Sequence, residues 1–427
     1  MINNSVKENI IVWRKKIFWM LWVTYASFYL CRVNISVALP KIMNEFSLTK
    51  TSMGLVLTSL TIFYAFGQFI NGQIGDKINS RLMITTGLFI SALFNLLFGF
   101  SGGILGAMLV IWGLNGYFQS MGWGPTVKAL ANWFPSKIRG KFSGRLGTSY
   151  ILGGALSLLL AGFIIKYLNW RWTFWIPAAI CILMAFHWYI RGRNAPEEVG
   201  LPTLEEQAEE IETREVRKDE HIGFRSTLKI TLMNPAVWLI GLALLCLNIV
   251  RYGFMSWAPT YMFEEQGATI SMAAFKTVAL PVAGCLGAIF AGWISDRIFK
   301  YHRVRVSFIM FILLGTFCYL FRLIPGSNWK LSLICLLLIG FMTYGPHVLM
   351  VCALPMDLGS RKAASSVTGF IDSMGYVGAS LVGVGTGYLV DNFGWAYAFY
   401  FWIASAFFAA ILMLLLWNYK PQKREYE

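Results

Sequence analysis

The chain has 427 residues, of which 57% are hydrophobic and only 13% are charged. A soluble globular protein averages about 45–50% apolar and about 25% charged residues, so this composition excludes an ordinary soluble domain and indicates a membrane protein. The formal net charge of +15 would suggest nucleic-acid binding in a soluble protein, so its placement along the chain matters.

Apolar stretches long enough to cross a bilayer recur along the whole chain. A bilayer core about 30 Å thick needs roughly 20 apolar residues per helix. By this criterion we predict an all-α membrane protein with twelve transmembrane helices. They are expected at residues 17–38, 53–75, 82–101, 104–130, 142–168, 171–191, 236–262, 272–295, 306–324, 329–352, 364–390 and 394–417.

The basic residues fall mainly on one side of these helices. With both termini in the cytoplasm, 26 of the 36 Lys and Arg residues lie on the cytoplasmic side and six on the other, and four lie within spans. This bias follows the positive-inside rule. It predicts a multi-pass integral membrane protein with cytoplasmic termini, and it accounts for the positive charge without a nucleic-acid partner.

The longest polar stretch separates the sixth predicted helix from the seventh. Its residues 197–220 hold ten of the 21 acidic residues, with basic residues interleaved. Such a mixed charge run is typical of a solvated linker, which can be partly helical. We therefore predict an N-terminal six-helix bundle over 1–191, a cytoplasmic linker over 192–229 and a C-terminal six-helix bundle over 230–427.

The two halves repeat the same features in the same order. Each contains an arginine with a proline eight residues later, then a Gly-x-x-x-Asp motif followed by a basic residue, then a Gly-Pro pair. The two sets are Arg32, Pro40, Gly72, Asp76, Lys77 and Gly124-Pro125, and Arg251, Pro259, Gly292, Asp296, Arg297 and Gly345-Pro346. A period of about 220 residues indicates a duplicated unit. Two parallel six-helix repeats around a central cavity are the layout of the major facilitator fold.

The loop motif at residues 72–81 resembles the signature of that superfamily between its second and third helices. A glycine permits close helix approach, and an aspartate can bond a neighbouring helix end and basic residues. Such contacts can form and break as two halves rock, although a simple hydrophilic turn is the alternative. The predicted gating residues are Gly72, Asp76, Lys77, Arg81, Asp296 and Arg297.

Two arginines lie deep within equivalent predicted helices. A charge at the bilayer centre costs roughly 2.5–3.5 kcal/mol on insertion scales, so such a residue is a functional-site hypothesis. Arg32 and Arg251 can face one cavity from opposite sides, and a guanidinium offers a planar fork that suits phosphate and carboxylate. We predict a clamp for a small dianion. Structural ion pairing is the alternative, but the apolar spans contain almost no acidic partners.

Further residues are candidates for the same site, each with a simpler alternative. Lys128 either adds a third positive charge or snorkels to the cytoplasmic interface. Asp372, the one acid predicted deep in the membrane, either pairs with a buried cation or titrates. His347 is either functional or packed and hydrogen-bonded. The aromatic candidates, which can line the cavity or simply pack, are Tyr25, Tyr29, Tyr64, Trp123 and Tyr376.

No enzyme or nucleotide motif accompanies these residues. A GxxxxGK[ST] phosphate loop does not occur, and no Ser/His/Asp or metal-ligand cluster stands out. We therefore expect no cofactor, no direct drive by ATP from this chain and no enzymatic activity.

Four segments together resemble the organophosphate:phosphate antiporter family of the major facilitator superfamily. They are residues 29–34 (YLCRVN), 121–128 (MGWGPTVK), 251–261 (RYGFMSWAPTY) and 369–376 (GFIDSMGY). Family members exchange glycerol 3-phosphate, hexose phosphates or phosphoglycerates for inorganic phosphate, and some relatives are sugar-phosphate sensors. The resemblance implies that Arg32 and Arg251 bind the phosphoryl group.

The sequence departs from the glycerol-phosphate members of this family at three positions. Gln68 stands where those members have a lysine, Tyr150 where they have a histidine, and Val33 where they have a second basic residue. Asp372 and Lys128 resemble the hexose-phosphate members more closely.

Three functions remain open. The leading hypothesis is an antiporter that exchanges a hexose phosphate, such as glucose 6-phosphate, for inorganic phosphate. The alternatives are a membrane sugar-phosphate sensor and a proton-coupled organic-anion symporter that uses Asp372. We expect a monomer in the bilayer of a bacterial inner membrane.

Overall fold

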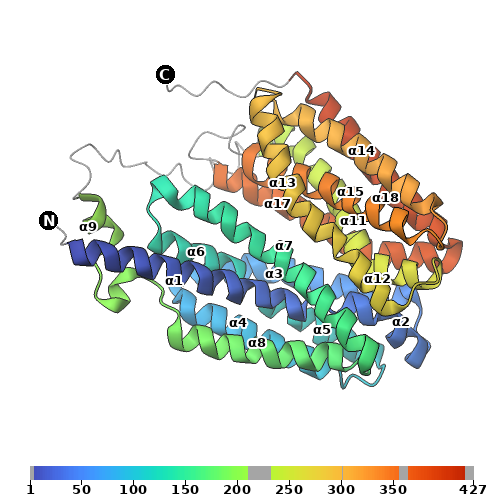
Figure 1. Cartoon of the computed structure of the whole chain (residues 1–427), viewed down its shortest axis with the longest axis horizontal. Helices are drawn as coiled ribbons and strands as arrows, with labels where there is room; N and C mark the ends of the chain where they lie inside the picture. The colour runs from blue at the N-terminus through green and yellow to red at the C-terminus, as the bar shows by residue number, and fades with distance from the viewer. Residues whose placement is uncertain (1–3, 210–231, 301, 355–363, 419–427) are drawn as a thin grey trace. The chain divides into compact units, whose positions relative to one another are not determined.

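The computed structural model describes residues 4–209, 232–300, 302–354 and 364–418. Within these ranges every regular element is a helix (Figure 1). The chain divides into two compact units, one of Met1–Ile35 with Ser59–Lys218 and one of Ser36–Thr58 with Asp219–Glu427. The predicted six-helix halves 1–191 and 230–427 remain a prediction.

The helices follow one another with short connections. In the first unit they are α1 (Asn4–Phe28), the 3-10 turn η1 (Tyr29–Cys31), α4 (Ser80–Phe98), α5 (Leu105–Gln119), α6 (Trp123–Trp133), α7 (Ser136–Tyr167), α8 (Trp172–Arg191), η2 (Pro196–Val199) and α9 (Leu204–Glu209). In the second they are α11 (Pro235–Glu264), α12 (Ile270–Thr277), α13 (Ala279–Arg297), α14 (Arg303–Leu323), α15 (Trp329–Val348), the π-helical turn η3 (Leu349–Ala353), α17 (Ala364–Phe393) and α18 (Trp395–Leu415). Two helices cross the unit boundary: α2 (Ile35–Phe46) and α3 (Lys50–Lys77).

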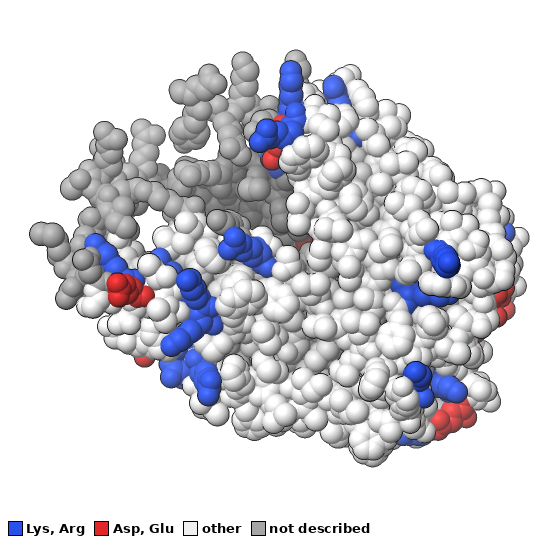
Figure 2. Space-filling view, viewed as in Figure 1, with Lys and Arg blue, Asp and Glu red and all other residues white. Residues whose placement is uncertain are grey.

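Nine segments in the described part of the chain are long and apolar enough to cross a membrane. On the face in view of Figure 2, Lys, Arg, Asp and Glu are sparse and most of the surface is uncharged. The prediction of an all-α membrane protein is confirmed, whereas the count of twelve helices stays a prediction. Two of the predicted spans that do not meet the criterion, 17–38 and 104–130, are each divided between two helices.

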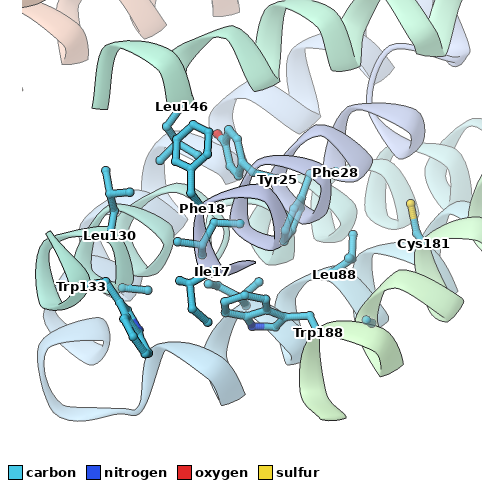
Figure 3. Packing of buried hydrophobic residues seen from close by; sticks show 14 of the residues in the cluster. Ile17, Phe18, Tyr25, Phe28, Leu88, Leu130, Trp133, Leu146, Cys181 and Trp188 are labelled. Atoms are coloured by element: carbon cyan, nitrogen blue, oxygen red, sulfur yellow. The ribbon is translucent and has the colours of Figure 1, made fainter. Parts of the chain in front are cut away.

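The core of the first unit is formed by residues of α1, α4, α6, α7 and α8 (Figures 1 and 3). Large apolar side chains fill it, with the rings of Phe18, Phe28, Trp133 and Trp188 almost completely buried. Close packing of this kind fixes the helices, because any change in side-chain volume is felt by the neighbours. Tyr25 of α1 belongs to the same cluster, which places the polar end of one tyrosine at its edge (Figure 3).

The first helix is interrupted between Phe28 and Ile35. An interrupted helix leaves backbone carbonyls without their usual partners, and in an apolar surrounding these must be satisfied by side chains. Gln119 of α5 donates to the carbonyl of Phe28 (2.8 Å), and Asn115 of α5 donates to that of Cys31 (2.9 Å). Two amide side chains of α5 therefore satisfy backbone carbonyls at this break and stabilise it.

Residues 193–207, the first part of the predicted linker, pack on the first unit. Arg14 of α1 donates to the carbonyl of Trp133 and to the side chain of Gln207, both at 2.8 Å. Asn79 donates to Glu198 (3.0 Å), and Leu201 packs against the apolar cluster. The rest of the predicted linker, residues 210–229, lies outside the described residues.

The second unit is built from α11, α13, α14, α15, α17 and α18 (Figure 1). The helix α11 begins with a strong signal: Asn234 caps its first turn by accepting from the amide of Ala236, and Pro235 follows in the first helical position. The pairs α13 with α15, α11 with α17 and α14 with α18 pack along their lengths. Unlike the first helix, α11 is continuous through its arginine, Arg251.

The amino-terminal part of α3 also belongs to this unit, where it packs against α17. Asp391 of α17 accepts hydrogen bonds from the backbone amides of Lys50 (3.1 Å) and Thr51 (2.6 Å) and so caps α3. Thr58 donates to the carbonyl of Ser380 at 2.9 Å. Gly383 allows this approach, because a Cβ there would lie 2.5 Å from the Thr58 hydroxyl. The contact is therefore close and specific.

Candidate functional site

Arg32 lies at the break in the first helix, directly after the 3-10 turn. It is 8% exposed, and its guanidinium carbon is 4.3 Å from the ring centroid of Tyr64 and 5.3 Å from that of Tyr29. A cation within about 6 Å of a ring face is attracted by the ring quadrupole. Such ring contacts stabilise a positive charge that is largely removed from water.

The other aromatic candidates of the first unit continue this group. The ring of Tyr25 is 4.8 Å from that of Trp123 and 6.1 Å from that of Tyr29. Tyr150 of α7 joins both, at 6.2 Å from Tyr29 and 6.3 Å from Trp123. The structure thus brings Tyr25, Tyr29 and Trp123 together, and Arg32 lies over the rings of Tyr29 and Tyr64.

A buried polar network supports the backbone that carries Arg32. Besides its bond to Phe28, Gln119 donates to the hydroxyl of Ser91 (3.0 Å), which in turn donates to Asn115 (2.6 Å). Asn34, just after the arginine, donates to Asn95 (3.1 Å) and to the carbonyl of Thr173 (2.9 Å). These amides are nearly completely buried, so the network fixes the position of Arg32 through its neighbours on both sides.

Arg251 occupies the corresponding place in the second unit. It is half-buried, and its Nη1 lies 2.9 Å from Nε2 of His347 on α15. Its guanidinium carbon is 4.8 Å from the ring centroid of Tyr344 and 5.4 Å from that of Tyr252. This guanidinium too is seated on aromatic rings, and one of the predicted candidates, His347, contacts it directly.

Asp372 and Tyr376 lie one turn apart on α17 and are both half-buried. Asp372 is close enough for its charge to interact with that of Arg251. Whether Asp372 pairs with this cation or titrates stays a prediction. Tyr376 accepts a hydrogen bond at its carbonyl from Ser380, and its ring remains a predicted lining residue.

Lys128 and the predicted gating residues lie at helix ends. The ammonium of Lys128 on α6 donates to the carbonyl of Ile78 (3.3 Å), just beyond α3, and its role in the site stays a prediction. Arg81 lies over the ring of Tyr189 at 5.8 Å. Asp296 and Arg297 are exposed in the last turn of α13. The side chains of Gly72, Asp76 and Lys77, at the end of α3, lie outside the described residues.

Several residues around the two arginines were not expected from the sequence. The ring of Tyr344 lies against the guanidinium of Arg251. Asn115 and Gln119 donate hydrogen bonds to backbone carbonyls at the helix break beside Arg32. A signal existed for Tyr344, because it precedes His347 by one helical turn and so shares its face. Within the described residues, no group of three or more His, Cys, Asp or Glu residues could hold a metal ion.

The sequence matches the profile of the Major Facilitator Superfamily over residues 21–383. In solved structures, a bacterial homologue of the human lysosomal transporter Spinster has a TM-score of 0.75 to this chain at 16% identity. That match covers 94% of this chain and 96% of the other, so it supports the fold.

Curated relatives cover nearly the whole chain. A glycerol-3-phosphate transporter of Bacillus subtilis is 32% identical over 412 residues, covering 95% of this chain and 92% of that protein. A protein of Chlamydia muridarum named "Probable hexose phosphate transport protein" is 30% identical, covering 98% and 94%. The membrane sensor protein UhpC of Escherichia coli is 30% identical, covering 95% and 92%.

Proposed function

This chain belongs to the Major Facilitator Superfamily, and two of its relatives are named as transporters of glycerol 3-phosphate and of hexose phosphate. We propose that this chain exchanges an organophosphate for inorganic phosphate. The exchange would proceed by alternating access, with no covalent step. We propose further that the protein works as a monomer in a bacterial inner membrane. Both termini would lie in the cytoplasm, an orientation that the distribution of basic residues favours.

The single observation that carries this proposal is the environment of the two arginines. Each guanidinium lies against two aromatic rings within its own unit, and each stands at the same place in the sequence repeat. Rings hold a cation without cancelling its charge, and the guanidinium fork suits the oxygens of a phosphoryl group. We therefore propose that Arg32 and Arg251 both bind the phosphoryl group of the substrate.

A hexose phosphate is the organophosphate that the chain favours. Gln68, which stands where the glycerol-phosphate members carry a lysine, donates to the hydroxyl of Tyr64 (2.9 Å), and the ring of Tyr64 contacts Arg32. A neutral amide thus replaces a cation at this position, while the half-buried rings of Trp123 and Tyr150 could contact a larger organic part. The hexose-phosphate relative supports the same choice.

Electrostatics explains why such a carrier exchanges its substrates. Closing an empty site would desolvate both arginines, although an acid, Asp372, lies near Arg251, and effective burial penalties are several kcal/mol per ion. A penalty of about 4 kcal/mol against closure slows the empty return step about a thousandfold. A bound phosphate neutralises the arginines, so loaded crossing is fast and no dedicated coupling ion is needed.

A sensor is the second candidate function, because UhpC is similar over almost the whole chain. A sensor would bind a sugar phosphate at the same residues but would not move it across the membrane. Binding alone does not separate the two functions, whereas exchange across a membrane does.

Competition for bound phosphate tests the ligand class. Glucose 6-phosphate should displace labelled inorganic phosphate from the purified protein, and free glucose should not, because only the ester carries the charge that the arginines attract. Replacing Arg32 or Arg251 by Lys keeps the charge but removes the fork, and should weaken phosphate binding at least about tenfold. Equal displacement by glucose, or wild-type affinity in both variants, would contradict the proposal.

A further inference from the structure

The contact between Arg251 and His347 fixes the state of the histidine. A guanidinium has only hydrogen-bond donors, so across the 2.9 Å contact the Nε2 of His347 must accept. An imidazole that accepts at Nε2 is neutral and carries its proton on Nδ1. That Nδ1 is buried and has no hydrogen-bond partner among the described residues, so no described group there stabilises a second positive charge.

The local fold of α15 places this histidine in a buried position. His347 is 8% exposed and follows Gly345 and Pro346, where the proline removes one backbone hydrogen bond. The helix then continues as the π-helical turn η3, a form that is frequent at functional sites. Gly345 lies directly beside the side chain of Met310, which leaves no space for a Cβ at this position.

The neutrality of this partner matters because an acid is already present. Asp372 on α17 interacts with the charge of Arg251, so one positive and one negative charge lie near each other in this unit. A second acidic partner would give the group a net negative charge, which repels a phosphate dianion. A neutral acceptor instead fixes the guanidinium without adding a negative charge.

We propose that His347 is a positioning residue, a neutral acceptor that orients the Arg251 guanidinium for a phosphoryl group and leaves the charge of Arg251 available to it. The inference rests on the proposed function, since it takes Arg251 as a phosphate-binding residue. It assigns to His347 control over anion affinity through geometry and charge, with no contact between the histidine and the ligand.

Three substitutions of His347 separate the contribution of its hydrogen-bond geometry from that of its neutral charge. His347→Gln places a neutral oxygen acceptor near the position of Nε2 and should bind inorganic phosphate within about threefold of the wild type. His347→Leu removes the acceptor and should weaken binding about tenfold or more, since a hydrogen bond to a charged group is lost. His347→Glu has the shape of the Gln variant but adds a negative charge, and should weaken binding at least as much.

A double variant tests whether the loss of affinity in His347→Glu is caused by the added negative charge. Adding Asp372→Asn to His347→Glu returns the group to its original net charge and should restore at least about tenfold of the lost affinity. The probe is labelled inorganic phosphate, measured on detergent-purified full-length protein that elutes as a single species.

The outcomes distinguish the inference from the function on which it rests. If the wild type binds phosphate but His347→Leu or His347→Glu binds it equally well, the positioning role is wrong and the proposed function stands. If His347→Gln is as weak as His347→Leu, the residue acts by packing and the inference is also wrong. If the wild type binds neither phosphate nor glucose 6-phosphate, the proposed function fails and the inference fails with it.

Discussion

Gln119 offers a direct test of how the first unit positions its arginine. Its amide donates to the carbonyl of Phe28 at 2.8 Å and to the hydroxyl of Ser91 at 3.0 Å, next to the break that carries Arg32. Gln119→Met keeps the length of the side chain but removes both donors. Hydrogen bonds between membrane helices average about 0.6 kcal/mol and reach about 1.7 kcal/mol, so the two bonds together are worth about 1–3 kcal/mol.

This loss should appear in binding as well as in stability. If the whole free energy of the two lost hydrogen bonds appears as weaker binding at Arg32, phosphate affinity falls by about fivefold to about a hundredfold. The assay is binding of labelled phosphate alongside thermal unfolding in detergent. Asn71→Leu is the matched control, because Asn71 on α3 is equally buried and donates to Ser120 at the end of α5 (2.7 Å) without touching the break.

The two variants should therefore differ in one measurement only. Both lose stability, but only the Gln119 variant should lose phosphate affinity, since only that amide supports the backbone beside Arg32. If the Gln119→Met protein binds phosphate like the wild type while its stability falls as in the control, the network serves packing alone and the reasoning is wrong.

Two further predictions concern the packing of each unit. Gly383→Val should lower the stability of the second unit by about 1–3 kcal/mol through overpacking against Thr58, whereas Gly385→Val, where a Cβ meets nothing closer than 4.0 Å, should have a much smaller effect on thermal unfolding. Arg14→Ala removes the contacts to Trp133 and Gln207 and should make the 196–209 segment several-fold more sensitive to limited proteolysis, while Lys15→Ala, at an exposed position, should not. Equal effects of each variant and its control would contradict the packing described.

Hydropathy predicted most of this fold because burial in lipid imposes a simple rule on composition. A continuous apolar stretch of about 20 residues has few alternatives to a membrane helix. The same rule does not reveal where a helix is interrupted. The break after Phe28 depends on amide side chains of α5, which are distant from Arg32 in the sequence. No local sequence pattern near Arg32 predicts these contacts.

The candidate site shows the same division. Arg32 and Arg251 were predictable because a buried charge is costly and therefore rare, and Tyr64 was among the expected lining residues. Their actual surroundings were not, since the ring of Tyr344 reaches Arg251 from another helix and the hydrogen bond from Arg251 selects the neutral form of His347. Such pairings are set by helix packing, which a pattern of single residues does not encode.

Uptake of labelled phosphate into vesicles tests the central claim most directly. Purified protein is reconstituted into vesicles that contain inorganic phosphate, glucose 6-phosphate or neither, at one fixed pH on both sides. Exchange driven by the charge of the two arginines predicts uptake about a hundredfold faster or more in either loaded preparation than in empty vesicles. Equal uptake by empty vesicles, or accumulation driven by an imposed proton gradient alone, would contradict obligatory exchange, and binding without any uptake would identify a sensor.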